Sequence, residues 1–209
     1  MSTDITLFKF WKNIQNSESE TILETPSFFL RTASVNDAKE LAALLTLSFH
    51  GDDPWMEIFH PILRFGIYED LRSRIQSKTT RYACIIACQH DVGDRPHPRI
   101  MGTVELSVKR RSLSFFSSQY AYISNLATHP DYRRQGVAQH LLNGCEVVAQ
   151  RWGFQDIYLH TLENNAPAQA LYHKLGYQVE RSEIGLSTWL LGQPKQLLLG
   201  KTLSVGSNQ

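Results

Sequence analysis

The sequence predicts an α/β (α+β) single domain with a mixed central sheet of about six to seven strands and flanking helices. Strand-like apolar stretches and helix-like amphipathic stretches alternate along the whole chain instead of being grouped at one end. The segment "YISNLAT", the helix-like run after it and the segment "IYLH" together resemble a parallel strand–helix–strand crossover. The 209 residues suffice for one domain with a sizeable core.

The elements are predicted in the order β-α-α-β-β-β-α-β-α-β-β. Strands are expected at 27–33, 80–89, 99–109, 120–128, 156–162, 176–183 and 196–203, and helices at 34–50, 55–78, from about 135 to 152, and from 165. The basic segment 109–119 is predicted to be a solvated loop that leads into the next strand. The alternative for its run Lys109–Arg111 is a local patch that guides an acidic binding partner. The predicted domain is 27–201, preceded by an N-terminal helix or linker arm, 1–26, and followed by a tail, 202–209.

The ends of the helices follow from their capping residues. Ser34 is a typical N-cap, with Asp37 three residues on. Pro54 marks a turn, Gly153 is placed as a C-terminal stop, and Pro167 lies in a first helical turn, where its missing N–H does no harm. The helix before Gly153 is expected to bury one stripe, made of Ala138, Leu141, Leu142, Cys145, Val148, Ala149 and Trp152.

Composition and charge restrict the classes of partner. Hydrophobic residues make up 42% of the chain, and the formal net charge is +1, which gives no reason to expect a nucleic acid partner. No apolar run is long enough for a membrane span. The three cysteines fit free thiols in a reducing compartment, and no Cys/His set has metal-ligand spacing, so no metal is expected.

The stretch "RRQGVA", 133–138, precedes the long helix predicted to end before Gly153. A helix N-terminus presents unbonded N–H groups and the positive end of the helix dipole, which together favour phosphate. Gly136 leaves room for an oxygen to approach the backbone, Ala138 keeps the next turn small, and Arg133 and Arg134 add donors suited to phosphate. From these residues alone, a diphosphate site and a solvated basic helix cap both stay open.

Two motifs resemble the GCN5-related N-acetyltransferase (GNAT) superfamily. Its acetyl-CoA motif, Q/R-x-x-G-x-G/A, is matched by residues 133–138, with Ala138 in the last place. Its later motif, N-x-x-A-x-x-L-Y-x-x-L-G-[FY], is matched by Asn165, Ala168, Leu171, Tyr172, Leu175, Gly176 and Tyr177. The resemblance extends over about 27–201 and is closest to the plastid and cyanobacterial branch. It implies the GNAT fold, acetyl-CoA as co-substrate and no metal.

The resemblance also implies which residues hold the coenzyme. The backbone N–H groups of Gln135, Gly136, Val137 and Ala138, with Arg133 and Arg134 nearby, would bind the diphosphate. The strand containing Leu126, Ala127 and Thr128 would pair with the pantetheine arm, and the Leu126 N–H would polarise the acetyl carbonyl. Asn165, together with Ala168 and Tyr172 on the following helix, would contact the coenzyme from the other side.

Acetyl transfer to an amine requires a neutral amine, a stabilised carbonyl oxygen and a proton for the departing thiolate. Tyr172 is the predicted general acid, because a phenol is protonated at neutral pH; the alternative is a core tyrosine. Some members of the superfamily that acetylate protein N-termini carry a tyrosine and a histidine at the positions of Tyr122 and His160, where they position a water that accepts the amine proton. The alternative for His160 is a buried strand histidine. Glu105 is the reserve base, and Glu163 a weaker one.

The resulting function is transfer of acetyl from acetyl-CoA to a primary amine of a protein or peptide, by direct attack in a ternary complex. A small amine, arylalkylamine or polyamine, is the first alternative, for which Asp52, Asp53 and Trp55 could close the groove. A non-catalytic CoA-binding sensor is the second. The sequence is compatible with a monomer or a homodimer. A bacterial cytoplasm is the expected compartment, because no transit-like leader is present, with the plastid stroma as alternative.

Overall fold

The computed structural model describes residues 21–49, 54–77, 81–90, 98–113, 116–183 and 194–203, which form one sheet with helices on both faces. The strands of the described residues are β1 (Thr21–Glu24), β2 (Phe28–Thr32), β3 (Tyr82–Gln89), β4 (Ile100–Leu113), β5 (Phe116–Thr128), β6 (Asp156–Leu162), β7 (Gln178–Glu183) and β8 (Gln196–Thr202). The helices are α2 (Ala38–Phe49), α3 (Pro54–Gln76), α4 (Val137–Arg151) and α5 (Ala166–Lys174), with short 3-10 turns at Val35–Asp37 and Pro130–Tyr132.

The strands lie in the order β1-β2-β3-β4-β5-β6-β8-β7. Every recorded pair is antiparallel except β5 and β6, which are parallel and are connected through α4, as the predicted crossover requires. The mixed α/β fold is therefore confirmed. The described residues contain eight strands, one more than the highest predicted number, because Thr21–Glu24 inside the predicted arm pairs with β2.

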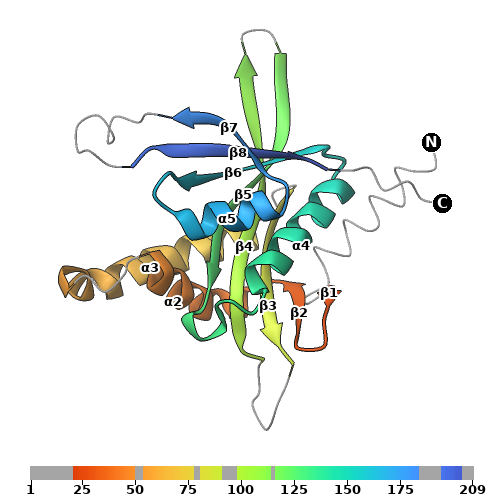
Figure 1. The fold of residues 1–209 in the computed structure, drawn as a ribbon. Coiled ribbons are helices and arrows are strands. Elements are labelled where there is room, and N and C mark those ends of the chain that lie inside the picture. The colour runs from red at the N-terminus through yellow and green to blue at the C-terminus, as the bar shows by residue number, and fades with distance from the viewer. Residues whose placement is uncertain are drawn as a thin grey trace.

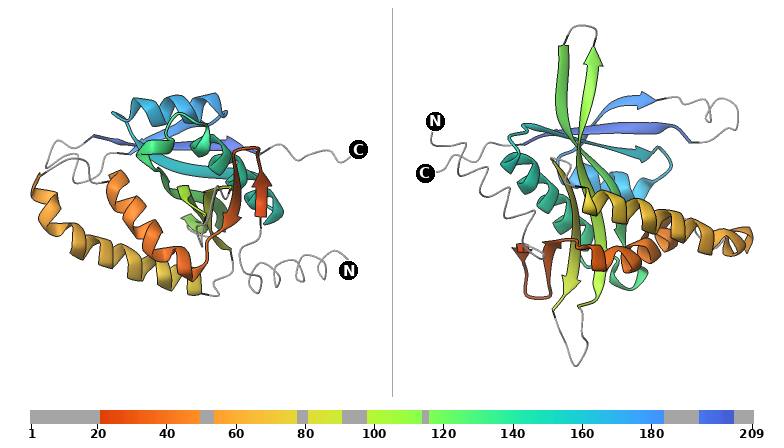
Figure 2. Two further views of the ribbon diagram at one scale, coloured as in Figure 1. Left: turned by 90° about the horizontal axis from the view of Figure 1, so that it is seen from below. Right: turned by 180° about the vertical axis from the view of Figure 1, so that it is seen from behind.

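The helices cover the sheet from two sides (Figure 2). Helices α2 and α3 lie on one face, where Leu41, Leu45 and Leu71 pack against Cys84 and Ile86 of β3. Helices α4 and α5 lie on the other face and bury the alternate side chains of the same strands, among them Ile85. None of the helices in the described ranges is long and apolar enough to cross a membrane.

Helix α4 buries a stripe close to the predicted one. Leu141, Leu142, Cys145, Val148 and Ala149 are buried as expected. The stripe begins at Val137, however, and the predicted members Ala138 and Trp152 are only half-buried. The helix ends at Arg151, and Gly153 follows with a φ of +84°, a conformation that glycine adopts without strain and that stops the helix as predicted.

The connection between β4 and β5 differs from the prediction. Lys109–Arg111 were expected at the start of a loop, but β4 continues to Leu113 and β5 already begins at Phe116. The pairing extends from Gly102 with Thr128 to Leu113 with Phe116, and this long hairpin projects beyond the other strands (Figure 1). The predicted loop is wrong because cross-strand pairing stabilises a segment whose basic, serine-rich composition does not favour a strand.

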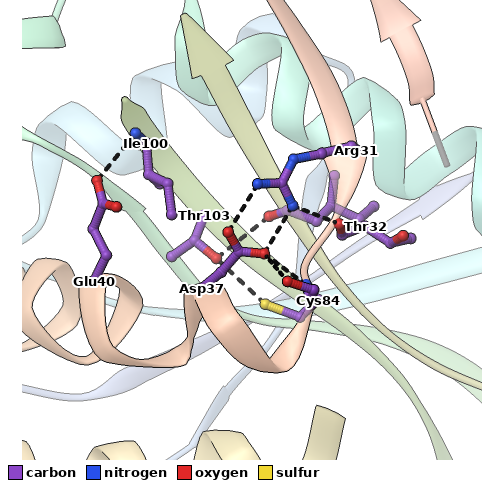
Figure 3. Close-up of polar contacts among 9 residues, drawn as sticks. Arg31, Thr32, Asp37, Glu40, Cys84, Ile100 and Thr103 are labelled. Atoms are coloured by element: carbon purple, nitrogen blue, oxygen red, sulfur yellow. Dashed lines mark hydrogen bonds and ion pairs between the residues drawn. The ribbon is translucent and has the colours of Figure 1, made fainter. Parts of the chain in front are cut away.

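A charged cluster fixes the start of α2 (Figure 3). The Arg31 guanidinium donates to both carboxylate oxygens of Asp37, each at 2.8 Å, and Asp37 also accepts from the Ser34 N–H at 2.7 Å. Burial by itself raises the pKa of Asp37, but the hydrogen bonds from Arg31 and Ser34 outweigh it and leave this pKa below its usual value. The predicted contact between Ser34 and Asp37 is confirmed. Arg31 lies on β2, so its ion pair with Asp37 also connects this strand to the start of α2.

Asp37→Asn is expected to lower the free energy of unfolding by about 2 kcal/mol at pH 7, because the ion pair and a charged acceptor are lost. Since the folded pKa is lowered, the contribution is present above the unfolded pKa and is lost as pH falls through the folded pKa. Urea unfolding at pH 7 and at pH 3 measures both effects. Glu69→Gln, at an exposed ion pair with Arg72, is the matched control and should change little.

Candidate active site

Strands β5 and β6 separate in the middle of the sheet. Their recorded pairing covers only Ala121–Ile123 with Ile157–Leu159, although β5 continues to Thr128 and β6 to Leu162. Figure 1 shows β6, β8 and β7 lying across the direction of β4 and β5. Among the described residues no strand pairs with this edge of β5 beyond Ile123, so the edge is available for pairing with an extended ligand. The predicted pantetheine-binding residues Leu126, Ala127 and Thr128 lie on this edge.

A β-bulge shapes this edge. Thr103 is opposite Ala127 and Glu105 is opposite Ser124, so β5 has one residue more than β4 between these pairs. Asn125 lies in the bulge with a φ of +53°, in the left-handed region that asparagine tolerates better than most residues. The bulge was not predicted. The feature of the sequence that indicates it is Asn125 itself, because asparagine is usually avoided inside a strand.

The predicted diphosphate site is a turn that leads into α4. Arg134 and Gly136 have positive φ values of +63° and +81°, and Gly136 is the N-cap. The first backbone bond from the helix returns from His140 N–H to the Gly136 carbonyl at 3.1 Å, so the N–H groups of Val137 and Ala138 precede the helical ladder. The Gln135 side-chain amide donates to the Asp131 carbonyl at 3.0 Å and braces the turn.

This turn has the properties of an anion site. Residues 133–136 are exposed, and Val137 is buried beneath them. The positive end of the α4 dipole, the unpaired amides of the first turn and the two arginines all favour a negatively charged group. Arg133 is also tied to β5, because its Nε donates to the Thr128 carbonyl at 3.5 Å. The turn and the open edge of β5 are therefore adjacent parts of one surface.

Tyr172 lies on α5 and is buried, with 7% of its surface exposed. Its ring contacts the ring of Tyr177 edge to face at 6.1 Å between centroids. Burial, and secondarily the nearby Tyr122, raise the pKa of Tyr172 to about 12. The phenol thus keeps its proton across the neutral and mildly alkaline range, as a general acid requires. The helix that carries it begins at Ala166 and is capped by Asn165, whose Oδ1 accepts from the Ala168 N–H at 3.2 Å.

Tyr122 and His160 are in direct contact. The Tyr122 hydroxyl and His160 Nδ1 are 2.7 Å apart. His160 is the first residue of β6 beyond the stretch that pairs with β5. His160 Nε2 faces Glu183 Oε2 at 3.4 Å, without an aligned hydrogen bond in the described residues. An Nε2–H directed at this carboxylate leaves Nδ1 to accept from the Tyr122 hydroxyl, which is the electrostatically favoured arrangement. The predicted pair is thus brought together.

Two charged residues beside this pair were not predicted as neighbours of Tyr122 or His160. Glu183 comes from β7, which has no motif in the sequence, and the pairing of β7 with β8 brings it near β6. Lys109 comes from β4, and its Nζ lies 3.2 Å from the centroid of the Tyr122 ring. Burial lowers the pKa of Lys109. The pairing of Ser107 with Tyr122 puts Lys109 on the same face, which composition alone could not show.

Glu105 is placed differently from the pair. Its side chain is 2% exposed, and both of its oxygens are engaged: Oε2 with Arg74 Nη1 at 2.5 Å and Oε1 with Asn125 Nδ2 at 2.9 Å. Glu163 accepts from the Lys195 N–H at 3.2 Å at the far end of β6. Asp52 and Asp53 lie outside the described residues, and only the backbone of Trp55 is described. Within the described ranges, no three His, Cys, Asp or Glu side chains are grouped to hold a metal ion.

Comparison with known proteins identifies the class that this fold and site define. The model of the acetyltransferase (GNAT) family matches residues 43–177, and the chain belongs to this family. GCN5-related N-acetyltransferase 10, chloroplastic, from Arabidopsis thaliana is 33% identical over 134 residues, which are 61% of this chain and 52% of that protein. The chain thus matches about half the length of this relative. The predicted resemblance to GNAT proteins with plastid-type relatives is confirmed.

Solved structures share the fold. A. thaliana NAA60 in complex with a bisubstrate analogue has a TM-score of 0.63 at 19% identity, covering 85% of this chain and 99% of that one. The ribosomal-protein-S18-alanine N-acetyltransferase from Escherichia coli has a TM-score of 0.57 at 16% identity, covering 87% and 98%. At such identities the likeness shows the common fold, and the roles of individual residues have to be argued from this chain.

Proposed function

We propose that this chain transfers acetyl from acetyl-CoA to a primary amine of a protein, an N-terminal α-amine, a lysine ε-amine or both. The observation that carries this proposal is the 2.7 Å contact between the Tyr122 hydroxyl and His160 Nδ1, at the point where β5 and β6 separate. A tyrosine and histidine pair at this place can orient a water that removes the amine proton. Glu183 stabilises the positive charge that His160 then acquires.

The coenzyme is proposed to lie along the open edge of β5. The amides of Gln135, Gly136, Val137 and Ala138 hold the diphosphate, with Arg133 and Arg134 at its exposed side. Backbone groups of Leu126, Ala127 and Thr128 pair with the pantetheine arm. Asn165 and Ala168 border the arm from the start of α5, where the Asn165 side chain caps the helix. Tyr172, in the last turn of α5 and near Tyr122, is proposed to reach the same gap.

The reaction uses each of these groups once. The ammonium form of the acceptor first loses one proton to water, which passes a proton to the Tyr122 hydroxyl while that hydroxyl passes its own to His160 Nδ1. The neutral nitrogen then attacks the thioester carbonyl and forms the new C–N bond. The Leu126 N–H donates to the carbonyl oxygen as it gains charge. When the C–S bond breaks, the Tyr172 hydroxyl donates a proton to the departing thiolate, and the second proton that the nitrogen loses, carried by water, restores the phenol. Direct attack in a ternary complex therefore needs no acyl-enzyme intermediate.

His160→Ala is expected to lower kcat at least about tenfold at pH 7 with a peptide whose α-amine has a pKa of about 8. The deficit should shrink toward pH 9, because more of the amine is then neutral without assistance. The pH dependence of kcat measures this shift. His90→Ala is the matched control: His90 contacts the Thr25 carbonyl beside β2, away from the β5–β6 gap, and its loss should leave kcat unchanged. Equal kcat of wild type and His160→Ala at all pH values would remove His160 from the mechanism.

The class of acceptor is tested by offering three pools of amine to the purified chain with acetyl-CoA. The pools are peptides with free α-amines and no lysine, α-acetylated peptides with lysine, and a mixture of arylalkylamines and polyamines. Release of CoA thiol and mass spectrometry of the products score each pool. Turnover of either peptide pool supports the proposal. Turnover of small amines alone would replace it by the small-amine alternative, and tight CoA binding without any turnover by the sensor.

The compartment and the oligomeric state stay predictions. The relative from A. thaliana carries the word chloroplastic in its name, which supports the plastid stroma over the bacterial cytoplasm. Monomer and homodimer are both compatible with the proposed chemistry, because the residues assigned to the site come from one chain.

A further inference from the structure

The geometry points to Glu105 as a positioning residue: with Arg74 and Asn125 it locks the β5 bulge that aims the Leu126 N–H at the reacting carbonyl. This inference rests on the proposed transferase function. The three side chains come from three elements: Arg74 from α3, Glu105 from β4 and Asn125 from β5. It replaces the expectation that Glu105 serves as a reserve base.

Asn125 is the residue that the bulge constrains most. Its φ of +53° lies in a region that costs an ordinary L residue about 1 kcal/mol or more, so the native backbone must hold it there. The Asn125 side chain supplies the tie, because its Nδ2 donates to Glu105 Oε1 at 2.9 Å. Glu105 pairs with Ser124, the residue just before the bulge, so the tie closes a small loop between neighbouring strands.

Glu105 can serve as an anchor because its charge is compensated. A buried carboxylate is expensive unless it is paired and hydrogen-bonded. Arg74 supplies the pair at 2.5 Å and is itself held by Asp70, at 2.5 Å, one turn earlier on α3. The groups of β3 that face Glu105 stay neutral at pH 7: burial raises the pKa of Cys84 to about 12 and raises that of Tyr82 as well.

The same contacts make Glu105 a poor base. Each carboxylate oxygen already accepts from a donor, and the side chain is 2% exposed, so an approaching water would have to displace Arg74 or Asn125. Leu126, by contrast, follows Asn125 directly, and its N–H direction depends on the Asn125 backbone. A reacting geometry displaced by about 1 Å costs about a hundredfold in rate. The lock therefore acts on kcat through the bulge and leaves the distant diphosphate site unchanged.

Three variants separate these roles. Asn125→Gly keeps a residue that adopts positive φ but removes the amide, Asn125→Ala removes both, and Glu105→Gln keeps an oxygen for Asn125 but removes the charge pair with Arg74. We expect Asn125→Ala to lower kcat about a hundredfold and Asn125→Gly no more than about tenfold. The Kd for CoA, measured by calorimetry, should stay within about threefold of wild type. Glu105→Gln should lower kcat at every pH without changing the shape of the pH profile.

The backbone amide signal of Leu126 in 15N-labelled protein provides a readout that does not need activity. It should shift and exchange faster with solvent in Asn125→Ala, and less so in Asn125→Gly. Loss of the acidic limb of the pH profile in Glu105→Gln, with Asn125→Ala as active as wild type, would overturn the inference and make Glu105 the base. An unchanged Leu126 signal in all three variants would overturn it independently. Absence of wild-type turnover would count against the proposed function, and the amide signal would still decide the lock.

Discussion

Gly136→Asp is expected to abolish binding of coenzyme A. Gly136 is the N-cap of α4, is exposed and has a φ of +81°, so it lies where an anion would meet the first amides of the helix. A Cβ at this position meets only the His140 ring at 3.6 Å, which is ordinary contact. Aspartate tolerates positive φ better than most residues, so the strain of the substitution should cost some stability without preventing folding. The new carboxylate competes with the diphosphate for the same amides and repels it.

Gly136→Asn is the matched control for charge. Asparagine has nearly the shape of aspartate and tolerates positive φ, but it carries no charge. Calorimetric titration with CoA should show no binding for Gly136→Asp at low salt and a measurable, weakened Kd for Gly136→Asn. Equal Kd values for the two variants would mean that a side chain of this size, and not its charge, disturbs the site. Wild-type binding by Gly136→Asp would contradict the placement of the diphosphate at α4.

Tyr172→Phe is expected to lower kcat about a hundredfold, the lower end of the usual range for general acid catalysis, because a thiolate leaves more easily than an amine. The Kd for acetyl-CoA should change little, since only one oxygen atom is removed. The pKa of Tyr172, raised to about 12, adds a second expectation. Deprotonation of Tyr172 should therefore not lower the kcat of the wild type until the pH approaches this pKa.

Tyr177→Phe is the matched control for the loss of a buried phenol. Tyr177 is as buried as Tyr172, contacts its ring and has a hydroxyl near Glu146 on α4, away from the gap between β5 and β6. Single-turnover kinetics of both variants with a saturating peptide separate chemistry from product release. A Tyr172→Phe variant that turns over like Tyr177→Phe would show that the thiolate obtains its proton from water.

Local patterns predicted the local structure of those parts of the candidate site that lie on single elements. Residues 133–138 and the start of α4 are contiguous in sequence, and the helix cap, the turn and the arginines are all visible in one short stretch. The same holds for α5, where Asn165, Pro167 and the apolar spacing define the helix that carries Tyr172. Tyr122 and His160 were predicted from a resemblance and are confirmed as neighbours by the pairing of β5 with β6.

Features that depend on the exact register between distant segments were not predicted. The separation of β5 from β6 and the bulge at Asn125 arise from the registers of three strands, and no single strand sequence specifies them. In the sequence Glu105 has no visible partner and was predicted as a reserve base. In the structure it forms an ion pair with Arg74, which lies 31 residues earlier. Thr21–Glu24 lacks a strong pattern and becomes a strand by pairing with the edge of β2.

A crystal structure of the chain with coenzyme A tests the central claim most directly. We expect diphosphate oxygens about 3 Å from the amide nitrogens of Gln135–Ala138, the pantetheine arm paired with Leu126–Thr128, and the sulfur within hydrogen-bonding distance of the Tyr172 hydroxyl. Phosphates bound elsewhere, or a sulfur remote from both Tyr172 and the Tyr122–His160 pair, would contradict it.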